Sequence, residues 1–144
     1  MGRGYRDNDS RQYDRWMVYA YTDLFSARKL AEDERCQRNA VFHCQQCIEK
    51  ALKAYLMFKR HRLYDGHNLT WLCKQAMQYD HNFEKWLEKS TAVNKFYIET
   101  RYPSDTMIDI TTEMLNNLIE STFDILEFIT QLIHYDYMSS RRKN

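Results

Sequence analysis

Apolar residues recur every three or four positions along most of this chain, which is the spacing of amphipathic α-helices. A first stripe runs from Tyr13 to Ala31 and a second from Ala40 to Phe58. The second stripe is wide, because further apolar residues flank it. We therefore expect the second helix to lie at the centre of the fold and to touch two or more neighbours.

Three more helices follow the same spacing. A short one comes after Asn68, a candidate N-cap. A fourth carries apolar positions from Phe83 up to Pro103, the only proline, which cannot continue a helix. The last helix is expected to begin after a cap on Ser104 or Asp105 and to run for roughly thirty residues.

The composition agrees with a helical fold. Three glycines and one proline among 144 residues exclude a turn-rich all-β protein. A hydrophobic fraction of 44% is enough for a sizeable core without disulfides or metal. We expect an all-α, up-and-down four-helix bundle with an extra short helix. One helical domain would cover residues 13–137, between a flexible N-terminal segment, 1–12, and a flexible basic tail, 138–144.

A net charge of +1 hides an uneven distribution. Residues 35–62 carry seven basic residues and one acid, whereas residues 99–136 carry eight acids and one base. This asymmetry indicates either a basic face for a polyanion or two segments that attract each other. Two solvated helix faces of opposite sign would give the same pattern.

No apolar run is long enough to cross a membrane, and the N-terminus lacks the apolar core of a signal peptide. We therefore expect a cytoplasmic protein with reduced thiols. Cys44 and Cys47 have the spacing of half a zinc site, but no second pair completes it. Because both lie on the apolar stripe, we interpret them as small core residues and expect no metal or other cofactor.

Two loose Arg-x4-His matches occur in the basic region, Arg38 with His43 and Arg62 with His67. Residues five apart on a helix point about 140° apart, so the first pair would not converge. His43 is better interpreted as a partly buried helix histidine.

Glu49 and Lys53 are one turn apart, the spacing of a favourable helix ion pair. One interpretation is a local salt bridge on a solvated face. The other is a basic ridge along a groove, in which Glu49 orients Lys53.

The segment that ends at Pro103 holds the best candidate for chemistry. Proline pushes Tyr102 out of the helical region, so the helix should end at Arg101. Tyr97 lies one turn before Arg101 on the same face. A stacking ring beside a guanidinium fork suits a nucleotide or a phosphate. Alternatively, Arg101 pairs with an acid of the last helix and Tyr97 belongs to the core.

Three strings in order resemble HEPN domains, the higher eukaryotes and prokaryotes nucleotide-binding family. Residues Ala40–Ala54 are similar to the family's second helix, and Gly66–Leu69 to its short His-x-Leu stretch. Residues Phe96–Pro103 resemble its Tyr-x-x-x-Arg-Tyr-Pro helix end. The likeness covers about residues 14–133.

The resemblance implies a helical bundle that often forms a homodimer, in a prokaryotic protein frequently encoded beside a minimal nucleotidyltransferase. Some members are metal-independent ribonucleases that act as toxins, with an Arg-x4-6-His signature at the start of the last helix. The matching arginine is Arg101, and no histidine follows it at that distance. Arginine alone cannot act as the base, so the resemblance favours a binding module over an enzyme.

The leading hypothesis is a nucleotide- or RNA-phosphate-binding module that partners a minimal nucleotidyltransferase in a two-component or toxin–antitoxin system. A degenerate metal-independent ribonuclease and a structural or protein-interaction bundle are the alternatives. The candidate binding residues are Arg101, Tyr97, Tyr102, Lys53, Glu49 and His43.

Overall fold

A computed structural model describes residues 9–103 and 108–137 as a bundle of five α-helices with no strand. The helices are α2 (Asp9–Leu30), α3 (Gln37–Arg60), α4 (Leu69–Met77), α5 (Glu84–Arg101) and α6 (Thr112–Leu132). Two 3-10 turns, η1 (Glu34–Cys36) and η2 (His81–Phe83), precede α3 and α5. The predicted all-α bundle of four main helices and a short one is confirmed.

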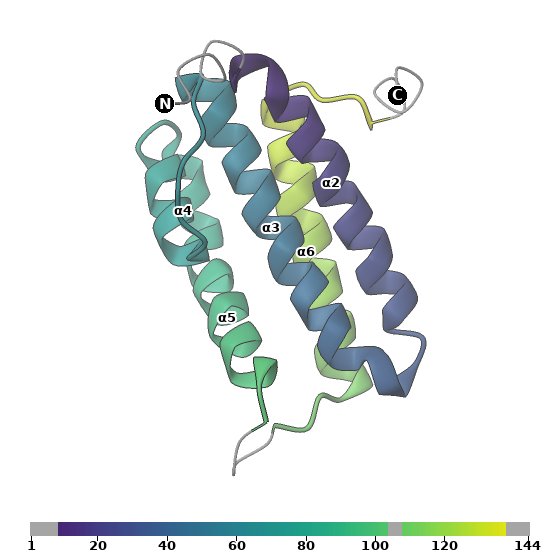
Figure 1. Ribbon diagram of the computed structural model, residues 1–144. Coiled ribbons are helices and arrows are strands. Elements are labelled where there is room, and N and C mark those ends of the chain that lie inside the picture. Colours follow the sequence, from purple (N-terminus) through teal and green to yellow (C-terminus); the bar gives the residue numbers. More distant parts are fainter. Residues whose placement is uncertain (1–8, 104–107, 138–144) are drawn as a thin grey trace.

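The long helix α3 lies at the centre, as its wide apolar stripe predicted. It packs against α2, α4, α5 and α6. In Figure 1, α2 lies on one side of α3 and α5 on the other, with α6 behind. The short helix α4 packs against both α3 and α5. Small, fully buried side chains let these neighbours approach α3: Ala40, Cys44, Cys47, Ala51 and Ala54.

The interpretation of Cys44 and Cys47 as core residues is confirmed, because neither is exposed. Burial raises the pKa of the Cys44 thiol to about 12. Burial also holds the pKa of the Cys47 thiol well above its usual range. Both thiols therefore stay protonated and unreactive near neutral pH. Within 9–103 and 108–137, no group of three or more His, Cys, Asp or Glu side chains could hold a metal ion.

The loop between α3 and α4 begins and ends as local chemistry dictates. His61 takes the left-handed conformation, with φ 58°, and its backbone N–H donates to the carbonyl of Met57. At the other end, the Asn68 side chain accepts from the backbone N–H of Trp71 at 3.0 Å, which confirms the predicted cap. Asn94 of α5 accepts from the backbone N–H of Leu69 at 3.2 Å and so holds the start of α4 against α5.

The helix α5 ends as predicted, whereas α6 does not begin where predicted. Tyr102 is extended, with φ −127° and ψ 153°, as a residue before proline prefers. The predicted start of α6 near Ser104 or Asp105 is wrong, because α6 begins at Thr112; those two residues themselves lie outside the described residues. The side chain of Thr111 accepts from the backbone N–H of Met114 at 3.1 Å and caps the helix. The apolar residues Ile108 and Ile110 lie in non-helical chain before this cap, and Ile110 packs on the core from there.

The N-terminal helix also differs slightly from its expected bounds. α2 begins at Asp9, four residues before Tyr13. Residues 1–8 and 138–144, which hold most of the two segments predicted to be flexible, lie outside the described residues. Among the residues that are described, no helix combines the length and apolar character needed to span a membrane.

Candidate functional site

A groove of about 420 Å³ lies between α3 and α5, at the start of α4. We call it the α3–α5 groove. It is lined by Phe42, Gln45, Gln46, Glu49, His67, Asn68, Asn94, Tyr97, Ile98 and Arg101. Three of the six predicted binding residues therefore meet here, namely Glu49, Tyr97 and Arg101. They come from two helices that are far apart in sequence, so only the fold brings them together.

Arg101 lies at the last turn of α5 and is held by two aromatic rings. The centre of its guanidinium lies 5.4 Å from the centroid of the Tyr97 ring and 5.1 Å from that of Tyr102. Tyr102 is 66% exposed and does not line the groove. Among the described residues, no ion pair joins Arg101 to an acid of α6, which was the alternative to an anion-binding role. The guanidinium thus lies against two aromatic rings and remains exposed to solvent.

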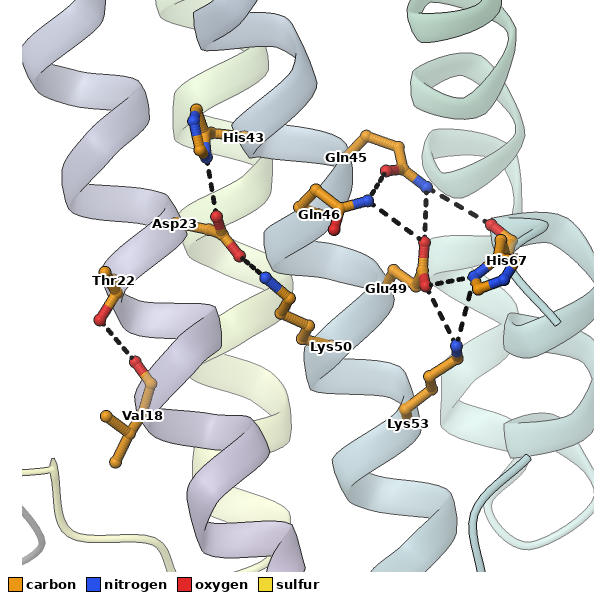
Figure 2. Close-up of polar contacts among 10 residues, drawn as sticks. All are labelled: Val18, Thr22, Asp23, His43, Gln45, Gln46, Glu49, Lys50, Lys53 and His67. Atoms are coloured by element: carbon orange, nitrogen blue, oxygen red, sulfur yellow. Dashed lines mark hydrogen bonds and ion pairs between the residues drawn. The ribbon is translucent and has the colours of Figure 1, made fainter. Parts of the chain in front are cut away.

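A buried carboxylate, Glu49, forms the floor of the groove, with donors on both oxygens (Figure 2). Its Oε1 accepts from the side-chain amides of Gln45 at 3.1 Å and Gln46 at 3.5 Å. Its Oε2 lies 3.1 Å from Lys53 Nζ and 2.8 Å from His67 Nδ1. Burial of an ionised carboxylate is tolerable only with such partners.

The Glu49–Lys53 ion pair forms as predicted, but the first of the two interpretations, a salt bridge on a solvated face, is wrong. The two side chains are 8% and 5% exposed. The loop after α3 runs over this face of the helix, and the backbone carbonyl of His67 lies 3.4 Å from the Gln45 side-chain amide. Lys53 does not line the groove itself. Its Nζ lies next to two residues that do, 3.1 Å from Glu49 Oε2 and 3.4 Å from His67 Nδ1.

His67 lines the groove too, although the sequence analysis did not select it as a binding residue. Its side chain is 82% exposed, and its Nδ1 is bonded to Glu49. An ionised carboxylate can only accept, so Nδ1 carries the hydrogen and Nε2 remains for a ligand. The Arg-x4-His spacing paired His67 with Arg62, whereas in the structure His67 is bonded to Glu49. The useful signal was its place in the stretch Gly66–Leu69, directly before the cap of α4.

His43 lies in a different cluster, on the side of α3 that faces α2 (Figure 2). Asp23 of α2 is buried between His43 and Lys50. One carboxylate oxygen lies 2.7 Å from His43 Nδ1 and the other 2.6 Å from Lys50 Nζ. The interpretation of His43 as a partly buried helix histidine is confirmed, since its side chain is 28% exposed. It meets the α3–α5 groove only through the ring of its neighbour Phe42.

The ion pairs of α3 also bear on the uneven charge distribution. Lys50 pairs with an acid of α2, and Lys53 pairs with an acid of α3 itself. Among the residues described, neither lysine pairs with α6, so the two oppositely charged segments do not attract each other through them.

The model of the family described as HEPN domain matches residues 13–132, which is most of the chain and all of its bundle from the first apolar stripe onward. This match confirms the resemblance drawn from the three strings. No curated protein matches the chain.

We expect Glu49→Ala to lower the free energy of unfolding by about 3 kcal/mol, because it leaves Lys53 buried without its acid. The double variant Glu49→Leu with Lys53→Met should recover most of this loss, because neither side chain is then charged. Urea unfolding at pH 7 measures both values. Glu88→Ala, at an exposed acid of α5, is the matched control and should change stability by less than about 0.5 kcal/mol. A loss at Glu49 no larger than at Glu88 would contradict the role of the pair.

Proposed function

The chain belongs to the HEPN domain family, and we propose that it is a module that binds a nucleotide or RNA phosphate in the α3–α5 groove. The observation that carries this proposal is the arrangement at the mouth of the groove. Arg101 is exposed there, beside the rings of Tyr97 and Tyr102. A guanidinium that already lies against two rings has less freedom left to lose when its N–H groups donate to a phosphate.

The remaining lining of the groove supports the same ligand. Its volume of about 420 Å³ falls within the range of small-molecule sites. Tyr97 and Phe42, whose ring centroids lie 5.9 Å apart, offer an aromatic wall on which a base can stack. Asn94 brings a side-chain amide to the same wall.

The charges of the groove also favour an anion. The carboxylate of Glu49 would repel a phosphate if it stood alone, but Lys53 lies 3.1 Å from it. Because these two opposite charges offset each other, the positive charge of Arg101 dominates the mouth. In this proposal, Lys53 supports binding by offsetting the charge of Glu49. Tyr102 supports it by orienting Arg101.

We expect Arg101→Ala to weaken binding of ATP, GTP or a short RNA at least tenfold. A hydrogen bond to a charged group contributes about 1.5–3 kcal/mol, and about 1.4 kcal/mol is a factor of ten. Arg101→Lys keeps the charge without the fork and should give an intermediate loss. Lys95→Ala, at an exposed lysine of α5 outside the groove, is the control. Calorimetric titration is the measurement. Absence of binding, or equal binding by Arg101→Ala, would overturn the phosphate site at Arg101.

A metal-independent ribonuclease is the second candidate, and one observation favours it. The signature histidine after Arg101 is missing, but His67 lines the same groove and is bonded to Glu49. A histidine oriented by a carboxylate can take a proton from an attacking hydroxyl through its other ring nitrogen, Nε2. Arg101 would then stabilise the charge that develops on the phosphate.

If the groove is catalytic, the wild-type protein will cleave total RNA in the presence of EDTA. His67→Ala should then lower the rate at least about a hundredfold, because general base catalysis contributes that much. His81→Ala, at an exposed histidine of η2, should leave the rate unchanged. Gel analysis of the RNA is the readout. Bound but intact RNA would reject the ribonuclease and retain the binding module.

The assembly implied by the family belongs to this proposal as well. We propose a cytoplasmic homodimer that partners a minimal nucleotidyltransferase in a prokaryotic two-component or toxin–antitoxin system. A hollow of about 350 Å³ between α5 and α6 supports the homodimer, because Val93, Phe96 and Met114 give it an apolar lining. A small nucleotidyltransferase gene next to this one, whose product co-purifies with the chain, is the expected sign of the partner; separate purification of the two would count against it.

Met114 is 39% exposed in this hollow, so Met114→Asp should convert a homodimer into a monomer. Asn116→Asp places the same charge on an exposed position of α6 outside the hollow and should leave the dimer intact. Light scattering coupled to size-exclusion chromatography gives the mass. A wild-type monomer at high protein concentration would contradict the homodimer.

A further inference from the structure

Besides the α3–α5 groove and the hollow between α5 and α6, a third hollow, of about 390 Å³, lies at the other end of α3 and has no role in the function proposed above. We call it the Trp71 hollow. Its lining includes the charged and aromatic residues Arg60, Arg62, Tyr64, Asp65 and Trp71, together with Leu63 and Gln75. Two guanidinium groups and two aromatic rings face one carboxylate, which is the composition of a site for a base and a phosphate.

The indole of Trp71 is held in place although it is 40% exposed. The loop passes against its six-membered ring at Gly66, where an added Cβ would lie 3.1 Å from the Cζ3 atom. Gly66 also has φ 144°, which other residues rarely adopt. The ring of Tyr64 lies beside the indole, with 5.9 Å between the ring centroids. A large ring that is fixed on one side and exposed elsewhere is suited to stacking on a base.

The wall beside the indole is ordered by hydrogen bonds. Arg60 donates from Nη1 to the hydroxyl of Tyr64 at 3.0 Å, and its guanidinium lies 5.5 Å from the centroid of that ring. The Tyr64 hydroxyl is also 3.4 Å from the hydroxyl of Tyr79. Arg62 is exposed at the rim. Only Asp65 opposes the two arginines within the hollow, so the local charge favours an anion.

The Trp71 hollow and the α3–α5 groove are neighbours along one path over the molecule. The loop after α3 runs beside α4 toward the start of that helix, as Figure 1 shows. Asp65 lines the Trp71 hollow and His67 lines the α3–α5 groove, and their Cα atoms can be at most about 7 Å apart. Measured along α3, the path from Gln45 to Arg60 is roughly 22 Å long. A mononucleotide is too short to occupy both hollows.

We propose that the two hollows are subsites for one single-stranded nucleic acid of several nucleotides, with a phosphate on Arg101 and a base on Trp71. The loop from Arg62 to His67 would lie under the strand between them. This inference rests on the proposed function for its Arg101 end, but the Trp71 end stands on its own residues. It also explains why an exposed tryptophan and two arginines lie beyond the groove.

The test compares ligands of different length by fluorescence anisotropy: ATP, and fluorescein-labelled oligomers of two and eight nucleotides. The octamer should bind at least about tenfold more tightly than the dinucleotide, because only the octamer reaches both subsites. Trp71→Ala should weaken octamer binding by about fivefold to a hundredfold, as expected for loss of one stacked base. Binding of ATP and of the dinucleotide should be unchanged by it.

Two further variants guard against a folding defect at Trp71. Trp71→Phe keeps an aromatic ring against Gly66 and should retain most of the octamer affinity. Arg62→Ala changes an exposed side chain and should also weaken the octamer but not ATP. Lys74→Ala, at an exposed lysine of α4 outside the hollow, is the matched control.

The outcomes separate this inference from the proposed function. Equal affinity for dinucleotide and octamer, with no effect of Trp71→Ala or Arg62→Ala, would overturn the inference and leave the groove proposal standing. Octamer binding that depends on Trp71 but not on Arg101 would overturn the groove proposal and with it the two-subsite strand. A deoxy-octamer tested beside the ribo-octamer shows which sugar is preferred. Equal binding agrees with a site for any single strand, and weaker binding of the deoxy-octamer identifies RNA as the ligand through its 2′-hydroxyl.

Discussion

The buried carboxylate of Glu49 is the constraint on which the site depends. An ionised group inside the protein is costly unless each oxygen is hydrogen-bonded. Gln45, Gln46 and Lys53 of α3 give each oxygen of Glu49 a donor, and His67 of the loop adds a further one to Oε2. This last bond holds the loop close to α3, beside the start of α4 and one wall of the groove.

The opposite wall depends on a different and purely local constraint. Pro103 forces Tyr102 out of the helix, so α5 ends at Arg101 and its last turn carries the guanidinium beside the groove. A bond between the side chain of Asn94 and the backbone of Leu69 then ties α5 to the start of α4. The groove thus lies between α3, which carries the buried Glu49–Lys53 ion pair, and α5, which ends just before Pro103.

This arrangement accounts for both functions considered. Arg101 at the mouth can hold a phosphate whether or not a reaction follows, and His67 beside Glu49 adds the one group that could move a proton. The loop that carries His67 also carries Arg62 and Tyr64 into the Trp71 hollow. A single loop, bonded to Glu49 through His67 and packed against Trp71 through Gly66, therefore links the α3–α5 groove to the Trp71 hollow.

Local patterns in the chain were enough to predict the helices, the central place of α3, the cap at Asn68 and the end of α5, because spacing, capping and proline geometry act within a few residues. The same patterns predicted Arg101 and Tyr97 as one turn of one face. The start of α6 was misjudged, since apolar spacing continues through residues that are not helical. The tertiary structure alone decided that Lys53 is buried, that His43 pairs with Asp23 of another helix, and that His67 meets Glu49 across 18 residues. These contacts depend on how the helices pack and on burial, and neither is encoded in the spacing of any one segment.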